Sequence, residues 1–277
     1  MENYFIPDPL KINDPFSDEI FCHFDKVIKD KKNHRFILSV SGGSDSILLL
    51  FLFIKYFKGN NDKLVICHIN HHLRSDSDID QSFISILGEK LNIRTYIKNL
   101  NPNEIPKGDS VEAWARESRY DYLNSVMTKT SADWVVTAHH ANDQAETIFM
   151  NISEKTGLFG LGGMKEINNK IIRPLLPFPK DFLMGIIEKY SIPYVVDSSN
   201  NNINYKRNFI RNVILNPWQK NNLNLIDAIT QVGNNFHEWQ ESILYFTKDF
   251  ILKNSLKNED GSFIIRKTEL KKLPKLA

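Results

Sequence analysis

A short segment rich in glycine and serine follows the first apolar run of the sequence. It reads Ser41-Gly42-Gly43-Ser44-Asp45-Ser46, directly after residues 36–40. Where a strand passes into a helix, backbone N–H groups can converge on an anion, and glycines let phosphate approach closely. The lysine of a Walker loop is missing. A turn with Ser or Asp as helix N-cap is the alternative, but it would not call for two adjacent glycines. We therefore predict a phosphate-binding loop.

A second polar segment, residues 137–147, follows the fourth apolar run. As the start of a helix it places His139, Asp143 and Glu146 on one side, at spacings of four and three residues. Carboxylates in a first helical turn can simply complement the helix dipole. Carboxylates clustered beside an imidazole are also what an ammonium nucleophile needs, both to dock and to lose its proton. The segment therefore favours a site for an amine substrate.

Residues 112–120 have helical spacing and carry Arg116 and Arg119. An i, i+4 salt bridge with Glu112 on a surface helix is the simple interpretation. At a phosphate-binding edge, however, the forked donors of arginine would steady a phosphate or an adenylate.

Two further segments carry reactive side chains. Residues 67–74 contain one cysteine and three histidines, but side chains alternate along a strand and would splay apart, which argues against zinc. The second segment covers residues 196–200 and is followed by Arg207 and Arg211. It is polar and basic, and we place it beside the apolar run 171–176. Alone, this second segment predicts a turn and a helix cap.

Apolar runs of strand length alternate with segments of helical period. We predict strands at 36–40, 64–67, 93–97 and 134–136, followed respectively by helices at 47–57, 78–91, 111–127 and 145–152. This alternation predicts an α/β fold, with a doubly wound, mainly parallel sheet covered on both faces. In such folds ligands lie beyond the carboxyl ends of the strands, where both polar segments fall.

The pattern changes near residue 216. An amphipathic stretch covers 225–252, and residues 262–265 are a strand candidate. We predict a nucleotide-binding catalytic domain over 1–215 and a smaller, mostly helical C-terminal domain over 216–277. The net charge is only +2, yet residues 201–277 hold 12 Lys/Arg against 7 Asp/Glu. This surplus fits either a polyanionic partner or a solvated basic face.

Composition excludes several classes of protein. Hydrophobic residues make up 42% and charged residues 25% of the 277, which is typical of a globular chain. Cys22 and Cys67 form no C-x-x-C pattern, which argues against a disulfide framework or an iron–sulfur cluster and fits a reducing cytoplasm. We expect neither a signal peptide nor a membrane span, because no apolar run is long enough.

The segment 41–46 resembles the SGGxDS signature of the PP-loop ATP pyrophosphatases. Five further segments narrow the resemblance: HINHHLR (68–74), EAWARESRYDYL (112–123), TAHHANDQAET (137–147), TGLFGLGGM (156–164) and IIRPLL (171–176), with the DSSN and RNFIR pair (197–200 and 207–211). In this order and at this spacing, over roughly residues 34–216, the chain resembles the tRNA(Ile)-lysidine synthetase family.

The resemblance implies an ATP-consuming enzyme. Members bind ATP with Mg²⁺, free lysine and an isoleucine tRNA with a CAU anticodon. They adenylate the wobble cytidine and let lysine displace AMP, which forms lysidine and changes codon reading from AUG to AUA. By resemblance, Ser41 to Ser46 would hold the ATP phosphates, and Asp45 would take part in catalysis by holding Mg²⁺.

The resemblance also implies roles for the other charged residues. His139 and Arg116 would assist adenylation, and Asp143 and Glu146 would bind the lysine ammonium. Contacts to tRNA or nucleotide phosphate would come from Arg119, Arg173, Arg207 and Arg211.

The sequence departs from the family at Glu154-Lys155, where members usually have Arg-Gly. The chain also stops where many members continue into a further C-terminal domain, so it is expected to be either a short form or a truncated one. Three alternatives stay open: another PP-loop tRNA-modifying enzyme, an amide-forming enzyme, and a non-catalytic nucleotide- or RNA-binding module. A thiolation enzyme would call for catalytic cysteines. Oligomeric state, including a homodimer, is also open.

Overall fold

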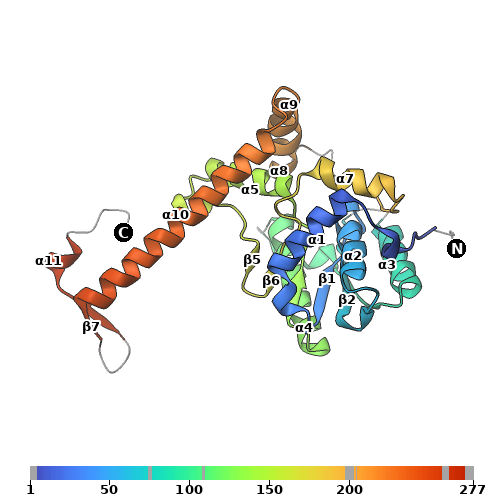
Figure 1. The fold of residues 1–277 in the computed structure, drawn as a ribbon, viewed down its shortest axis with the longest axis horizontal. Coiled ribbons are helices and arrows are strands. Elements are labelled where there is room, and N and C mark those ends of the chain that lie inside the picture. Colours follow the sequence, from blue (N-terminus) through green and yellow to red (C-terminus); the bar gives the residue numbers. More distant parts are fainter. Residues whose placement is uncertain are drawn as a thin grey trace.

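The protein is built on one six-stranded sheet (Figure 1). The computed structural model describes residues 5–73, 77–107, 110–196, 203, 205–257 and 262–271. The strands are β1 (Phe36–Ser39), β2 (Leu64–Asn70), β3 (Arg94–Asn99), β4 (Trp134–Val136), β5 (Ile167–Asn168) and β6 (Ile171–Ile172). Their order is β3-β2-β1-β4-β6-β5, and every pairing is parallel except that of β5 with β6. The predicted α/β class and its four strands are confirmed, whereas the two-residue strands β5 and β6 are too short for their periodicity to be recognised.

Helices cover both faces of the sheet. The helices of the domain are α1 (Pro15–Val27), α2 (Ser44–Tyr56), α3 (Ser77–Lys90), α4 (Val111–Thr130), α5 (Ala141–Ser153) and α7 (Lys180–Lys189). Phe36 and Leu38 of β1 join one buried cluster with α1, α2, α3 and α7, while Ile37 joins a second cluster with α4. Because side chains alternate along a strand, this continuous apolar run is buried on both sides.

The sheet changes direction of winding at β1. The strands β2 and β3 lie on one side of β1, and β4 and β6 lie on the other. Phe36 pairs with both Leu64 and Trp134 in register, so β1 and β4 end at the same edge. Such a switch point leaves a crevice where the following loops diverge. Residues 41–46 and 137–140 therefore meet there.

The chain continues into a helical region. Here lie α6 (Leu158–Leu161), α8 (Lys206–Phe209), a π-helix η6 (Ile210–Leu215), α9 (Asn216–Gln219) and the long α10 (Leu225–Asn254). The helical run from α8 to α9 crosses the predicted domain boundary near 216, and Ile210 and Leu215 pack with Leu225 and with Ala141 of α5. The division into two domains stays a prediction.

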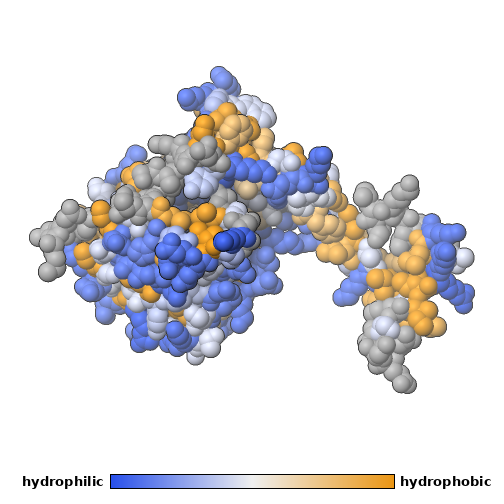
Figure 2. Space-filling model, turned by 180° about the vertical axis from the view of Figure 1, so that it is seen from behind, coloured by the Kyte–Doolittle hydropathy of each residue, from blue (hydrophilic) through white to orange (hydrophobic). Residues whose placement is uncertain are grey.

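The second half of α10 projects from the domain and carries a hairpin at its far end (Figure 1). The hairpin strands are β7 (Ser255–Lys257) and β8 (Phe263–Ile265), followed by α11 (Lys267–Leu270). The residues of α10 that are buried are Leu225, Ile226, Gly233 and Gln240, and no described residue of α10 after Gln240 is buried. Figure 2 shows hydrophobic residues along the projecting part, where Leu244, Phe246 and Leu252 are exposed.

Within the described ranges, no helix combines the length and apolar content needed to cross a bilayer.

The turn after α6 offers a test of its own packing against Gln144 of α5. Gly163 has φ +69°, and a Cβ there would lie 2.7 Å from Oε1 of Gln144. We expect Gly163→Ala to lower the free energy of unfolding by roughly 1–3 kcal/mol, because it adds backbone strain and a clash. Gly185→Ala, in open space on α7, should instead stabilise by roughly 0.5–1 kcal/mol. Urea unfolding of both variants measures the difference, and equal effects would contradict the assigned packing.

Candidate active site

The conformation of the loop between β1 and α2 is fixed by hydrogen bonds to one buried serine. The buried Ser46 hydroxyl accepts hydrogen bonds from the N–H groups of Ser41 and Gly42, both at 3.2 Å, and donates to the Gly43 carbonyl at 2.8 Å. Gly42 has φ +99°, a conformation that favours glycine. Ser46 therefore shapes the loop, while Ser41, Gly43 and Ser44 lie nearer the surface.

The first turn of α2 has no side-chain cap. Gly43 is the N-cap residue, and it makes no side-chain capping hydrogen bond. The alternative of a simple turn capped by Ser or Asp is therefore wrong for this segment. A helix start of this kind presents N–H groups and a partial positive charge, which favours an anion such as phosphate.

Asp45 points from this turn toward two cationic groups. Its Oδ1 lies 2.5 Å from the Lys180 ammonium and its Oδ2 lies 3.6 Å from Nε2 of His140. Burial acts to raise the pKa of Asp45, but His140 and Lys180 outweigh it and the pKa is lowered. Asp45 is therefore a carboxylate at neutral pH, with part of its side chain exposed.

His140 connects the phosphate loop to α5. Its Nε2 lies between the carboxylates of Asp45, at 3.6 Å, and Asp143, at 3.5 Å. Burial opposes protonation, yet the two carboxylates raise the pKa of His140 above its usual value. His140 was not among the predicted site residues. The prediction used its neighbour His139, because His139 lies four residues before Asp143 and would share a helix face with it.

Asp143 stands at the start of α5 with its charge well compensated. It accepts from the His140 backbone N–H at 3.0 Å and from the Arg207 guanidinium at 3.1 Å. Burial acts to raise its pKa, but His140, Arg207 and His139 lower it to about 2. Asp143 therefore keeps its negative charge throughout the physiological range.

Glu146 lies one turn further along α5 and holds two arginines. Its side chain is 1% exposed. It accepts from Nε of Arg207 at 2.6 Å, and from Nε and Nη2 of Arg211 at 2.5 and 3.0 Å. The structure thus brings Asp143, Glu146, Arg207 and Arg211 together. It pairs the predicted lysine-binding carboxylates with two of the predicted phosphate-binding arginines, and both roles stay predictions.

His139 faces a second group of cationic side chains. Its Nδ1 lies 2.8 Å from the Thr137 hydroxyl. Burial lowers the pKa of His139 to about 4, and Arg173, Arg207 and Arg119 add to the effect, although Asp143 opposes it. At neutral pH the His139 imidazole is therefore uncharged, and it is a weak base toward a bound ligand.

The three other arginines among the predicted site residues differ in their surroundings. Arg173 is 5% exposed and donates to the Lys165 carbonyl at 2.8 Å, while its buried Nε has no hydrogen-bond partner among the described residues. Nη2 of Arg119 lies 3.4 Å from Nε2 of His71. Arg116 is exposed and lies over the Tyr120 ring at 5.2 Å. The predicted residues Arg74 and Asp197, Ser198, Ser199 and Asn200 lie outside the described part of the chain.

The donor set fits a magnesium ion held jointly with a nucleotide. Mg²⁺ is usually bound through one or two carboxylates together with substrate phosphates and water. Asp45 supplies an ionised, partly exposed carboxylate beside the uncapped helix start. Among the residues with described positions, no group of three His, Cys, Asp or Glu side chains forms a ready metal site. Asp45 would hold such an ion only with ligands from the phosphates.

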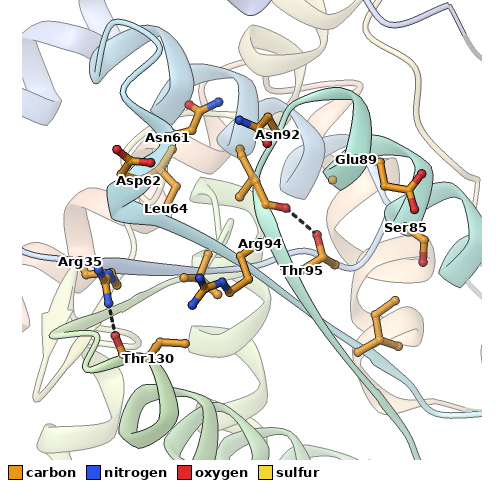
Figure 3. A pocket seen from close by; sticks show the side chains of 14 residues that line it. Arg35, Asn61, Asp62, Leu64, Ser85, Glu89, Asn92, Arg94, Thr95 and Thr130 are labelled. Atoms are coloured by element: carbon orange, nitrogen blue, oxygen red, sulfur yellow. Dashed lines mark hydrogen bonds between the residues drawn. The ribbon is translucent and has the colours of Figure 1, made fainter.

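A cavity of about 630 Å³ lies at the opposite edge of the sheet (Figure 3). Arg35, Leu64 and Arg94, which line it, stand at the amino ends of β1, β2 and β3. None of the predicted site residues lines it. Because ligands of this fold class settle beyond the carboxyl ends of the strands, the switch-point crevice remains the candidate site.

The buried histidines predict an acid-sensitive fold. The pKa of His71 and of His139 is about 4 in the folded state against 6.5 ordinarily, mainly through burial. The unfolded chain therefore binds more protons, and the stability that these groups contribute above pH 6.5 is lost as the pH falls toward 4. We expect the double variant H71Q/H139Q to flatten this decline in urea unfolding measured at intervals from pH 7.5 to 4. The exposed control His34→Gln should keep the wild-type slope.

Glu146 offers a test of the charge cluster. Glu146→Gln leaves two partly buried guanidinium groups with Asp143 as their one remaining carboxylate among the described residues, so we expect a loss of roughly 3–5 kcal/mol in the free energy of unfolding. The matched control is Glu154→Gln, at the other end of the same helix, where the exposed carboxylate pairs with Lys206 at 2.7 Å. That change should cost less than roughly 1 kcal/mol. Similar losses in both variants would show that the cluster does not hold α8 and η6 on α5.

Comparison with known proteins agrees with this geometry. A PP-loop domain model matches residues 17–217. The tRNA(Ile)-lysidine synthase of Mycoplasma mycoides is 31% identical over 87% of this chain and 60% of its own length, and that of Streptococcus sanguinis is 35% identical over 83% and 53%. The chain thus spans a little over half the length of these curated relatives.

A solved structure shares the fold. The U34-tRNA thiolase NcsA of Methanococcus maripaludis, determined with its [4Fe-4S] cluster, superposes with a TM-score of 0.65 at 21% identity, over 80% of each chain. With the domain match over residues 17–217 and the glycine–serine loop at the switch point, the chain belongs to the PP-loop family.

Proposed function

We propose that this protein joins lysine to carbon 2 of the wobble cytidine of an isoleucine tRNA with a CAU anticodon, with cleavage of ATP to AMP and pyrophosphate. The observation that carries the proposal is the junction at the switch point. There, the His140 imidazole lies within 3.6 Å of both the loop carboxylate Asp45 and the α5 carboxylate Asp143. A nucleotide in the loop and an amine at α5 would thus be neighbours.

In the first step the oxygen on carbon 2 of cytosine attacks the α-phosphorus of ATP, and pyrophosphate leaves. Ser41, Gly42, Gly43, Ser44 and the uncapped amides of α2 would neutralise the charge that grows on pyrophosphate, with Ser46 holding the loop in shape. Asp45 would hold Mg²⁺, which lends further positive charge to the phosphates when bound. His139 and Arg116 would orient the base and the adenylate.

In the second step the lysine ε-amine attacks carbon 2, and AMP leaves with the oxygen. Asp143 and Glu146 would dock the ammonium and ease the loss of its proton, because a protonated amine is not a nucleophile. Glu146 holds Arg207 and Arg211 in the ligand-free protein, so an incoming ammonium would compete with these guanidinium groups. Arg207 and Arg211, once displaced from Glu146, would contact nucleotide or tRNA phosphate, and Arg119 and Arg173 would add further phosphate contacts.

The cysteines favour this reaction over sulfur transfer, which the fold alone would allow. The sequence holds only Cys22 and Cys67. Burial raises the pKa of the Cys67 thiol to about 12, so it is no nucleophile at neutral pH. Cys22 lies alone on the surface of α1.

Mass spectrometry of a tRNA transcript tests the proposal. After incubation with ATP, Mg²⁺ and lysine, the anticodon cytidine of the isoleucine transcript should gain the mass of lysine less one water, with one AMP released per tRNA. Without lysine, an adenylated cytidine should accumulate. Asp143→Asn should lower the rate of lysine transfer by roughly 100-fold or more, in line with the loss of a general base, and leave adenylation nearly intact.

Two outcomes would contradict the proposal. One is ATP cleavage that does not depend on this tRNA, and the other is a product that carries sulfur or ammonia in place of lysine. A methionine tRNA transcript with the same anticodon is the matched control substrate. Arg94→Met, in the cavity at the opposite edge of the sheet, is the matched control variant and should keep the wild-type rate.

A further inference from the structure

A lysine from a distant part of the chain reaches into the phosphate loop. The Lys180 ammonium lies 2.7 Å from the Ser44 hydroxyl and 2.5 Å from Oδ1 of Asp45. These partners are 136 and 135 residues away in the sequence. Lys180 is the first residue of α7 and its side chain is about a third exposed, so its charge is not buried in the core.

The backbone of Lys180 is fixed by the other half of the site. Its N–H donates to Oδ1 of Asn142 at 2.9 Å, and the Ala141 N–H donates to the Phe178 carbonyl at 3.0 Å. The start of α7 is therefore attached to the start of α5, and the flexible lysine stem spans from there to α2. Pro179, the N-cap residue of α7, makes no side-chain capping hydrogen bond, so Asn142 of α5 supplies the side-chain acceptor at this helix start.

The phosphate loop itself contains no cation. In a Walker loop the lysine of the motif binds the terminal phosphates, and no residue between Ser41 and Ser46 can do so. Phosphates placed at the uncapped start of α2 would also meet the negative charge of Asp45. A cation within reach of Ser44 would relieve this repulsion, and Lys180 is already in contact with that hydroxyl.

We propose that Lys180 is the cation of this phosphate loop: it neutralises Asp45 in the ligand-free protein and binds the terminal phosphates of ATP when the nucleotide enters. The assignment rests on the proposed use of ATP. It adds a nucleotide-binding residue that the loop motif does not include.

Calorimetric titration of the full chain with ATP, AMP and inorganic pyrophosphate tests this assignment. Lys180→Met should weaken the binding of ATP and of pyrophosphate roughly 10- to 100-fold, the usual effect of one charge-assisted hydrogen bond. AMP, which lacks the terminal phosphates, should bind as in the wild type. Lys180→Arg should restore most of the affinity for ATP. Lys189→Met, at the other end of α7, where the ammonium pairs with Asp14 at 3.6 Å, is the matched control and should leave all three affinities unchanged.

For a second variant we expect the opposite effect, an increase in the affinity for pyrophosphate. In magnesium-free buffer, Asp45→Asn removes the carboxylate that holds Lys180 and repels phosphate, so pyrophosphate should bind more tightly than to the wild type. Loss of ATP and AMP binding to the same extent in Lys180→Met, or unchanged binding of both, would overturn the assignment and leave Lys180 a structural residue. A wild-type chain that binds no ATP would overturn the proposed function as well, so the two failures are distinguishable.

Discussion

The site depends on one buried imidazole held between two carboxylates. His140 lies between Asp45 of the loop after β1 and Asp143 of the helix after β4. The register of β1 with β4 brings the two loops to the same edge, but register alone would leave two negative charges facing each other at the switch point. The raised pKa of His140 allows it to carry the compensating charge. The imidazole therefore connects the nucleotide side of the site to the amine side.

Charge compensation explains the rest of the crevice. Asp45, Asp143 and Glu146 are each paired with cations that come from other elements: Lys180 from α7, Arg207 from α8 and Arg211 from η6. Buried carboxylates of this kind are tolerated only when they are paired. The charges of these carboxylates are thus compensated by the protein's own lysine and arginines. In the proposed reaction, ATP phosphates would bind such cations, and a substrate ammonium would take their place beside the carboxylates.

Sequence patterns were sufficient for four of the six strands and for the two loops of the switch point. Strand-length apolar runs, each followed by a helical period, located β1 to β4, and the SGGSDS and TAHH segments followed two of them directly. The pairing of charges could not be predicted in this way. Lys180 and Asp45 are 135 residues apart, and nothing in the local sequence of α7 distinguishes Lys180 from an ordinary surface lysine. The contact of Glu146 with Arg207 and Arg211 likewise depends on how α8 and η6 fold back onto α5.

The helix α5 makes polar contacts on two faces, and these contacts connect the candidate site to α10. Asp143 and Glu146 face the crevice. Between them in sequence, Gln144 turns the other way, where it donates to the carbonyls of Gly162 and Met164, both at 3.0 Å, and accepts from the Met164 N–H at 2.7 Å. The Gln240 side-chain amide of α10 donates a hydrogen bond to the carbonyl of Leu158, in the segment 158–164, at 3.0 Å. A rotation of α5 large enough to move Asp143 would have to break these hydrogen bonds, so the position of α10 and the geometry of the carboxylates are coupled through a single helix.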